Sequence, residues 1–236
     1  MNKRLLVLAA IAALALAPAI AGAVPIAIGG TGVLGTFSGT FDYTATNDTS
    51  GTVNIVLNND SLTAGWITAF LFNIPTGADV SAAILTQPLT DPVFGLLGAT
   101  TGDVPDASFN NGENGSPFGR FDIGAASGGG DFSGGGAPQL GIAQFGSASF
   151  SFALTGTGLG ALTAQDFLST LSVPPGAGEG VQGFVVRFRG FPDSGSDKVP
   201  NGPGEPGPVP EPGTLSLLGL GLASLAARWR ARATKS

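Results

Sequence analysis

The stretch "GTFDYTATNDTSGTVNIVLN", from Gly39 to Asn58, decides the fold class. Apolar and polar residues alternate in both of its halves, as they do in strands that have one buried face. Between the halves, "NDTSG" supplies residues that tolerate the unusual backbone angles of a tight turn. The stretch therefore predicts a β-hairpin whose buried face carries Phe41, Tyr43, Ala45, Val53, Ile55 and Leu57.

Three further segments have the patterns of strands. "AGWITAFLFNIP" (64–75) is apolar on both faces, which predicts a central strand of the core. "GSASFSFALTG" (146–156) and "GFVVRFRG" (183–190) alternate, and in the second of them Arg187 and Arg189 are expected side by side on the outer face. "LTAQDFLSTL" (162–171) predicts one short helix, because Thr163 and Asp166 have the spacing of a capping box.

Short strands between glycine-rich loops predict an all-β fold, an antiparallel β-sandwich of jelly-roll-like type. The composition agrees, since the chain has 39 glycines and only 11% charged residues. We expect this domain over residues 24–191, a Pro/Gly-rich linker over 192–208 and a separate terminal segment over 209–236.

The composition also excludes several classes of function. The sequence has no Cys and no His, which excludes disulfides, thiolate chemistry, most zinc and iron sites and any catalytic set built on His. Six of the ten basic residues lie in the first four or last nine positions, so the body between them is more acidic than the net charge of -6 suggests. Such a body repels phosphate backbones, and we expect no nucleic acid as a partner.

The N-terminus reads "MNKRLLVLAAIAALALAPAIAGAVP". Lys3 and Arg4 precede an apolar stretch, and Ala21 and Ala23 provide the small residues that signal peptidase requires. Residues 1–23 are therefore expected to be a signal peptide that is cleaved after Ala23, with an uncleaved anchor helix as the alternative.

The C-terminal segment, "VPEPGTLSLLGLGLASLAARWRARATKS", has three parts in order. The first is a Pro-Glu-Pro motif within residues 209–214, where the prolines hold the chain extended. The second is an apolar helix over 215–227, about 20 Å long and short against a hydrocarbon core of ~30 Å. The third is a basic tail over 228–236, which the positive-inside rule keeps cytoplasmic while the body lies across the membrane.

This order of parts resembles the PEP-CTERM sorting signal of Gram-negative bacteria. The resemblance implies an exosortase as partner, a transient stay in the inner membrane, and release or transfer of the protein outward. It makes Pro210, Glu211 and Pro212 the recognition motif, and it makes the tail arginines the retention signal: Arg228, Arg230 and Arg232. The arginines alternate with other residues instead of running consecutively, which departs from the family pattern. A permanent, unprocessed tail anchor is the alternative.

The stretch from Gly102 to Asp122 is the richest in side-chain oxygens, the ligands that Ca²⁺ prefers. Asp103, Asp106 and Glu113 are the candidate ligands, although their spacing fits neither an EF-hand nor a calcium-binding repeat. A solvated loop explains the same composition. Apart from this candidate calcium, we expect no cofactor.

Trp66 opens the most apolar strand, which favours a core role over a platform for stacking sugars. Arg187 and Arg189 suit an anionic polymer, or else ion pairs with carboxylates such as Asp42 or Asp122.

Catalysis would need a pair of carboxylates, and no spacing singles out two among the fifteen acidic residues that precede Glu211. "FDIGAASGGGDFSGGGAP" (121–138) lacks the Lys and the helix of a phosphate-binding loop, so its glycines predict a mobile loop or tight turns.

We therefore expect an exported protein that is not an enzyme. The family resemblance, including a vaguer likeness of the body to sandwich domains that carry such signals, implies a structural or adhesive role at the cell surface or in the extracellular matrix. That role is associated with exopolysaccharide or biofilm. The alternatives are a polysaccharide-binding module, with or without calcium, and an extracellular hydrolase.

Overall fold

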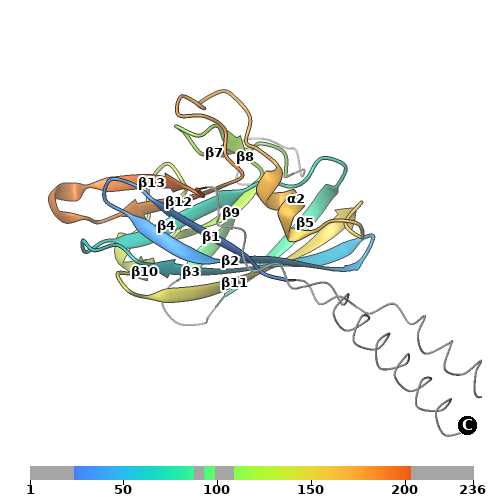
Figure 1. Cartoon of the computed structure of the whole chain (residues 1–236), viewed down its shortest axis with the longest axis horizontal. Helices are drawn as coiled ribbons and strands as arrows, with labels where there is room; N and C mark the ends of the chain where they lie inside the picture. Colours follow the sequence, from blue (N-terminus) through green and yellow to red (C-terminus); the bar gives the residue numbers. More distant parts are fainter. Residues whose placement is uncertain (1–23, 88–92, 99–108, 203–236) are drawn as a thin grey trace, which may run out of the picture.

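The computed structural model describes residues 24–87, 93–98 and 109–202. Two antiparallel sheets pack face to face (Figure 1). The first sheet has the strand order β1 (Ile26–Thr31), β2 (Thr36–Asn47), β3 (Ser50–Asn59), β11 (Ser147–Thr157) and β5 (Asp79–Thr86). The second has the order β13 (Ser196–Pro200), β12 (Phe184–Arg189), β4 (Trp66–Phe72), β9 (Ile123–Ser127) and β6 (Phe94–Leu97), and β10 (Ile142–Ala143) also pairs with β4. The predicted all-β antiparallel class is confirmed. The likeness to a jelly roll is looser, because β1, β2 and β3 follow one another as a meander within one sheet.

The predicted hairpin is formed by β2 and β3. Phe41 lies opposite Ile55 and Tyr43 opposite Val53, and all four side chains are buried. The turn is tighter than the sequence indicated, since β2 extends to Asn47 and β3 begins at Ser50. Within the turn, the side-chain oxygen of Asn47 accepts hydrogen bonds from the backbone N–H and the hydroxyl of Thr49.

Phenylalanines from both sheets fill the space between them. The ring centroids of Phe41 and Phe72 are 5.5 Å apart, and those of Phe70 and Phe150 are 4.8 Å apart. Full burial of each such ring contributes about 1.5–3 kcal/mol, and favourable ring geometry adds to it. The inward residues predicted from alternation therefore form the main core.

A second layer covers the outer face of the second sheet, which explains why β4 is apolar on both faces. It consists of residues 113–121, with the short strands β7 (Glu113–Asn114) and β8 (Arg120–Phe121), and of the glycine-rich segment 128–136. We call these two segments the outer layer; Figure 1 shows β7 and β8 on the side of this sheet away from β2 and β3. The cluster beneath it contains Ala69, Leu71, Leu97, Phe118, Phe121, Ala126, Phe132 and Val185.

The outer layer corrects two expectations. Part of the stretch predicted as a mobile loop or turns is the buried strand β9, and Phe132 within the glycine-rich part is 1% exposed. Arg187, expected on an open outer face, is buried beneath this layer and is 8% exposed. Isolated apolar residues among glycines give no periodic signal, so the sequence did not indicate that the face is covered.

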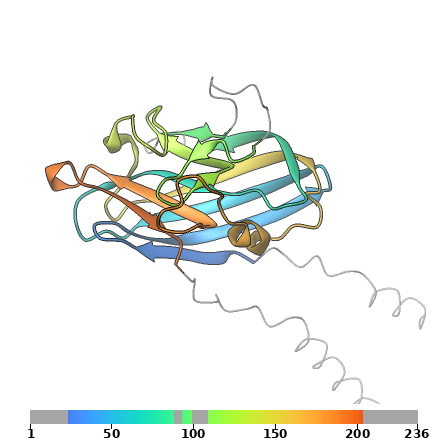
Figure 2. The same ribbon diagram turned by 90° about the horizontal axis from the view of Figure 1, so that it is seen from above.

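The predicted helix is α2 (Ala164–Ser169), and its capping box between Thr163 and Asp166 is present. It lies at one end of the sandwich beside the first sheet (Figure 2), where Phe167 packs against Tyr43 with ring centroids 4.8 Å apart. Two single 3-10 turns, η1 (Pro138–Leu140) and η2 (Pro192–Ser194), complete the described elements.

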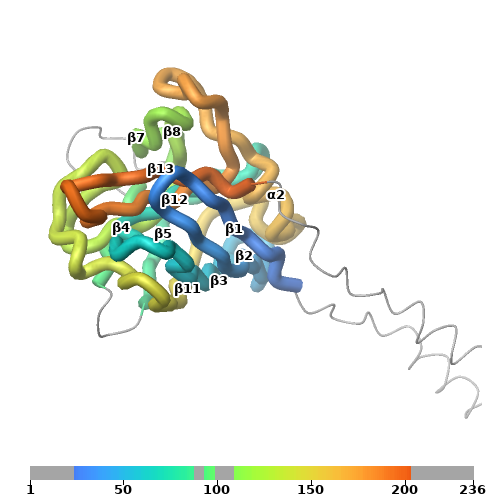
Figure 3. Tube along the Cα trace, turned by 60° about the vertical axis from the view of Figure 1, so that its left-hand side comes forward, coloured from blue at the N-terminus to red at the C-terminus, as the bar shows by residue number. Residues whose placement is uncertain are grey.

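The predicted start of the linker at residue 192 is wrong. After η2 the chain forms β13, which pairs with β12 and buries Val199 completely. Asn201 then accepts a 2.8 Å hydrogen bond from the backbone of Gly29, and Gly202 donates one to the oxygen of Gly29. Figure 3 shows β13 beside β1, so the described chain begins and ends at the same edge of the sandwich.

Candidate functional site

A cleft of about 720 Å³ lies at the end of the sandwich that carries α2. Four parts of the chain form it: residues 73–80, which lead from β4 into β5; residues 109–111; Asp122; and residues between Leu162 and Val173 in and around α2. We call it the polar cleft. Its size is typical of sites for small molecules, which are usually lined by apolar groups and a few placed polar ones.

Asn73 follows β4 and lines the polar cleft, and it is 1% exposed. Its side-chain nitrogen donates to the backbone oxygens of Thr170 at 3.0 Å and Gln182 at 3.3 Å. Its side-chain oxygen is buried and accepts no hydrogen bond. Turning the amide over would place that oxygen against two carbonyl oxygens, so the two donated bonds fix its direction.

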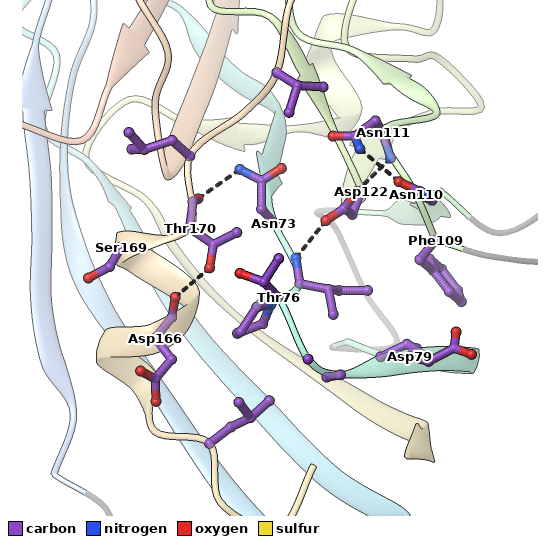
Figure 4. A pocket seen from close by; sticks show the side chains of 18 residues that line it. Asn73, Thr76, Asp79, Phe109, Asn110, Asn111, Asp122, Asp166, Ser169 and Thr170 are labelled. Atoms are coloured by element: carbon purple, nitrogen blue, oxygen red, sulfur yellow. Dashed lines mark hydrogen bonds between the residues drawn. The ribbon is translucent and has the colours of Figure 1, made fainter. Parts of the chain in front are cut away.

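Asp122 holds two walls of the polar cleft together. Its carboxylate accepts hydrogen bonds from the backbone N–H of Ile74, at 2.8 Å, and of Asn111 (Figure 4). Burial raises the pKa of Asp122, although these two hydrogen bonds act in the opposite direction. The carboxylate therefore serves to join residues 73–80 to residues 109–111.

Two other carboxylates line the polar cleft. Asp166 accepts hydrogen bonds from the backbone and hydroxyl of Thr163 in the capping box, and these bonds lower its pKa. Asp79 begins β5 and is exposed. Figure 4 shows the carboxyl groups of Asp79, Asp122 and Asp166 pointing in different directions instead of converging. The arrangement does not resemble a pair of carboxylates placed on either side of one bond.

Of the candidate calcium ligands, Glu113 is the one that the structure describes; Asp103 and Asp106 lie outside the described residues. Glu113 accepts a 2.9 Å hydrogen bond from the backbone of Gly98. Burial raises the pKa of its carboxyl group, against that hydrogen bond. Within the described part of the chain, no three His, Cys, Asp or Glu side chains gather as a metal-binding group.

The basic residues of the second sheet bind the outer layer. Arg187 donates to the oxygen of Phe132 at 2.7 Å, Arg189 donates to that of Gly135, and Lys198 donates to that of Ser116. Desolvation and the neighbouring Arg189 lower the pKa of Arg187. The expected partners of these arginines were wrong, because Asp122 bonds to backbone groups at the polar cleft and Asp42 lies on the first sheet.

Trp66 is neither an exposed platform nor a core residue. It is partly buried at the start of β4, where its ring lies so close to Gly190 that a β-carbon there would come within 2.6 Å of it. Sequence reasoning missed the polar cleft, because Asn73, Asn111, Asp122 and Thr170 belong to four separate segments and form no motif.

The predicted signal peptide, the Pro-Glu-Pro motif, the apolar helix over 215–227 and the basic tail lie outside the described residues. Among the residues that are described, no helix combines the length and the apolar character needed to cross a membrane.

Comparison with known proteins gives one match. Residues 208–231 match the family model described as the PEP-CTERM protein-sorting motif, a range that includes Pro210, Glu211, Pro212, Arg228 and Arg230 and stops one residue before Arg232. No curated protein and no solved structure matches the chain. The sequence order of motif, apolar stretch and arginines agrees with this match, and the chain thus carries a PEP-CTERM sorting motif of the kind that exosortase recognises.

Proposed function

We propose that the chain is exported, held briefly in the inner membrane by its C-terminal segment, and released by exosortase to the cell surface or extracellular matrix. There the β-sandwich acts as a structural or adhesive component and not as an enzyme. The observation that carries the sorting step is the match of residues 208–231 to the sorting motif.

The surface of the first sheet supports a structural role among hydrated neutral polymers. On the outer side of β2, β3 and β11, Asp42 is the one charged residue. The rest of that side consists mainly of hydroxyl and amide side chains: Ser38, Thr40, Thr44, Thr52, Asn54, Asn58, Ser147, Ser149, Ser151 and Thr155. Such a face offers hydrogen bonds without the charge that attracts polyanions.

Two observations argue against the binding of an extended polysaccharide on a sheet face and against a hydrolase. Among the described residues, Phe145 is the aromatic side chain that is largely exposed, so no aromatic row for stacking a polysaccharide crosses a sheet. The carboxylates of Asp122 and Asp166 already accept hydrogen bonds from backbone groups, which does not favour a hydrolase.

Intact mass measurement of the protein recovered from membranes and from culture medium tests the sorting step. We expect the released protein to lack residues 1–23 and the C-terminal span with its basic tail. Glu211→Ala should leave the full-length C-terminus in the membrane fraction. The matched control is Glu205→Ala, which removes a glutamate between Gly and Pro six residues earlier and should be processed normally. Released wild-type protein that still contains Trp229 and Lys235 contradicts the proposal.

A further inference from the structure

We propose that the polar cleft binds an uncharged, hydroxyl-rich ligand, namely a terminal unit of a neutral saccharide. This site lies in the folded body, and its test is independent of whether exosortase sorts the chain.

The charges and hydrogen bonds at the polar cleft disfavour anionic ligands and divalent metal ions. Asp79, Asp122 and Asp166 line it, and its described lining contains no Lys or Arg. An anionic ligand would meet repulsion without a compensating cation. A divalent cation would need free carboxylate oxygens, whereas Asp122 and Asp166 each hold backbone N–H groups. A neutral ligand avoids both penalties.

Asn73 gives the polar cleft an acceptor that the protein itself does not satisfy. Leaving a buried acceptor without a donor is costly, and nearly all buried polar groups in proteins have a partner. Figure 4 shows the Asn73 oxygen on the side that faces Asp122 and Asn111, away from Thr170. A hydroxyl group bound between these walls is the donor that this oxygen lacks.

The rim of the polar cleft offers both kinds of contact that a sugar uses. Thr76 and Asn110 are exposed and supply a hydroxyl and an amide. Leu171, 52% exposed, supplies apolar surface for the C–H face of a ring. Sites that place a few hydrogen-bonding groups against an apolar wall are typical of small-molecule recognition.

The test is saturation-transfer NMR and calorimetry on the purified exported protein. The probes are neutral trisaccharides of glucose, galactose, mannose and N-acetylglucosamine, with a trisaccharide of a uronic acid and Ca²⁺ alone as comparisons. We expect at least one neutral trisaccharide to bind at millimolar concentration. The uronic acid trisaccharide should show neither saturation transfer nor heat of binding, and Ca²⁺ should show no heat of binding.

The variants Asn110→Ala and Thr76→Val should each weaken that binding about fivefold or more, and both sites are exposed, so the fold should persist. The matched controls, Asn54→Ala and Thr44→Val, change the same residue types on the outer face of the first sheet and should bind like the wild type. The proposal is overturned if no neutral trisaccharide binds, because the cleft then holds water alone. It is also overturned if the uronic acid trisaccharide binds in the cleft, or if the cleft variants bind as well as the control variants.

Discussion

The guanidinium group of Arg187 donates a 2.7 Å hydrogen bond to the main-chain oxygen of Phe132, a residue 55 positions earlier in the chain. The ring of Phe132 is buried over the second sheet, and the ammonium group of Lys198 lies 5.3 Å from its centre. Phe132, the one aromatic residue within a run of glycines, therefore packs the outer layer against β12 and β13. The basic residues act as donors to that layer and leave no open basic face on these strands.

Phe132→Ala should lower the free energy of unfolding by about 3 kcal/mol, because it leaves a cavity between the outer layer and the second sheet. Urea unfolding followed by fluorescence or circular dichroism measures this loss. Phe145→Ala is the matched control: Phe145 is 72% exposed, so its loss should change the stability by less than about 0.5 kcal/mol. Equal effects of the two changes would show that Phe132 does not anchor the layer.

A protein truncated after residue 202 should fold, whereas a protein truncated after residue 191 should not. The shorter chain lacks β13, exposes the edge of β12 and loses the two hydrogen bonds that Gly29 makes, as donor to Asn201 and as acceptor from Gly202. Both proteins would be compared by their dispersion of amide resonances in two-dimensional NMR. A folded protein ending at residue 191 would support a linker that begins at residue 192.

Asn59→Ala should destabilise the end of the sandwich opposite α2 by about 3 kcal/mol. The Asn59 side chain is fully buried, donates to the oxygens of Gly65 and Ile142, and accepts from the backbone of Ser61. Its removal takes a buried hydrogen-bond partner away from all three backbone groups. Thermal unfolding checks this, with the exposed Asn54→Ala as the control that should have little effect.

Glu113→Gln should raise the melting temperature at pH 7 and leave it unchanged below about pH 4. Burial raises the pKa of Glu113 above 4.5 in the folded protein. The stability linked to its protonated form is fully present below the unfolded pKa and is lost as the pH rises through the folded pKa. Glutamine keeps an acceptor for the backbone of Gly98 without the charge.

The control for this variant is Glu179→Gln, which changes an exposed glutamate and should give no pH-dependent difference from the wild type. Glu113→Gln also tests the calcium hypothesis. If Glu113 is a ligand, added millimolar Ca²⁺ will stabilise the wild type and not the variant. A lower melting temperature of Glu113→Gln than of the wild type at pH 7 without calcium would contradict this prediction.

The sequence predicted the parts of the fold that local patterns encode. Alternation identified β2, β3, β11 and β12, and the spacing of Thr163 and Asp166 identified α2. The predictions that were wrong concern tertiary packing between segments that are distant in the sequence. Nothing local distinguishes Phe132 in a covering layer from a residue in a mobile loop, and the Ser, Pro and Gly residues around Val199 have the composition of a linker although Val199 itself is buried.

The candidate sites divide in the same way. The sorting motif is contiguous, so its residues were readable from sequence and match a family model. The polar cleft depends on Asn73, Asp122 and Thr170 meeting from distant segments, and on one unsatisfied amide oxygen. Neither the proximity of these three residues nor the missing hydrogen bond can be recognised from a local sequence pattern.

The pairing of β13 with β12 also limits how far the folded body can lie from the Pro-Glu-Pro motif. A linker that began at residue 192 would place eighteen residues before Pro210, with a reach of about 65 Å. With β13 folded, residues 203–209 separate the described body from Pro210, and their reach is at most about 25 Å. That is less than the span of β2 at about 3.3 Å for each of its 12 residues. Under the proposed sorting step, an exosortase that recognises Glu211 therefore meets its motif closer to the folded body than the length of one of that body's strands.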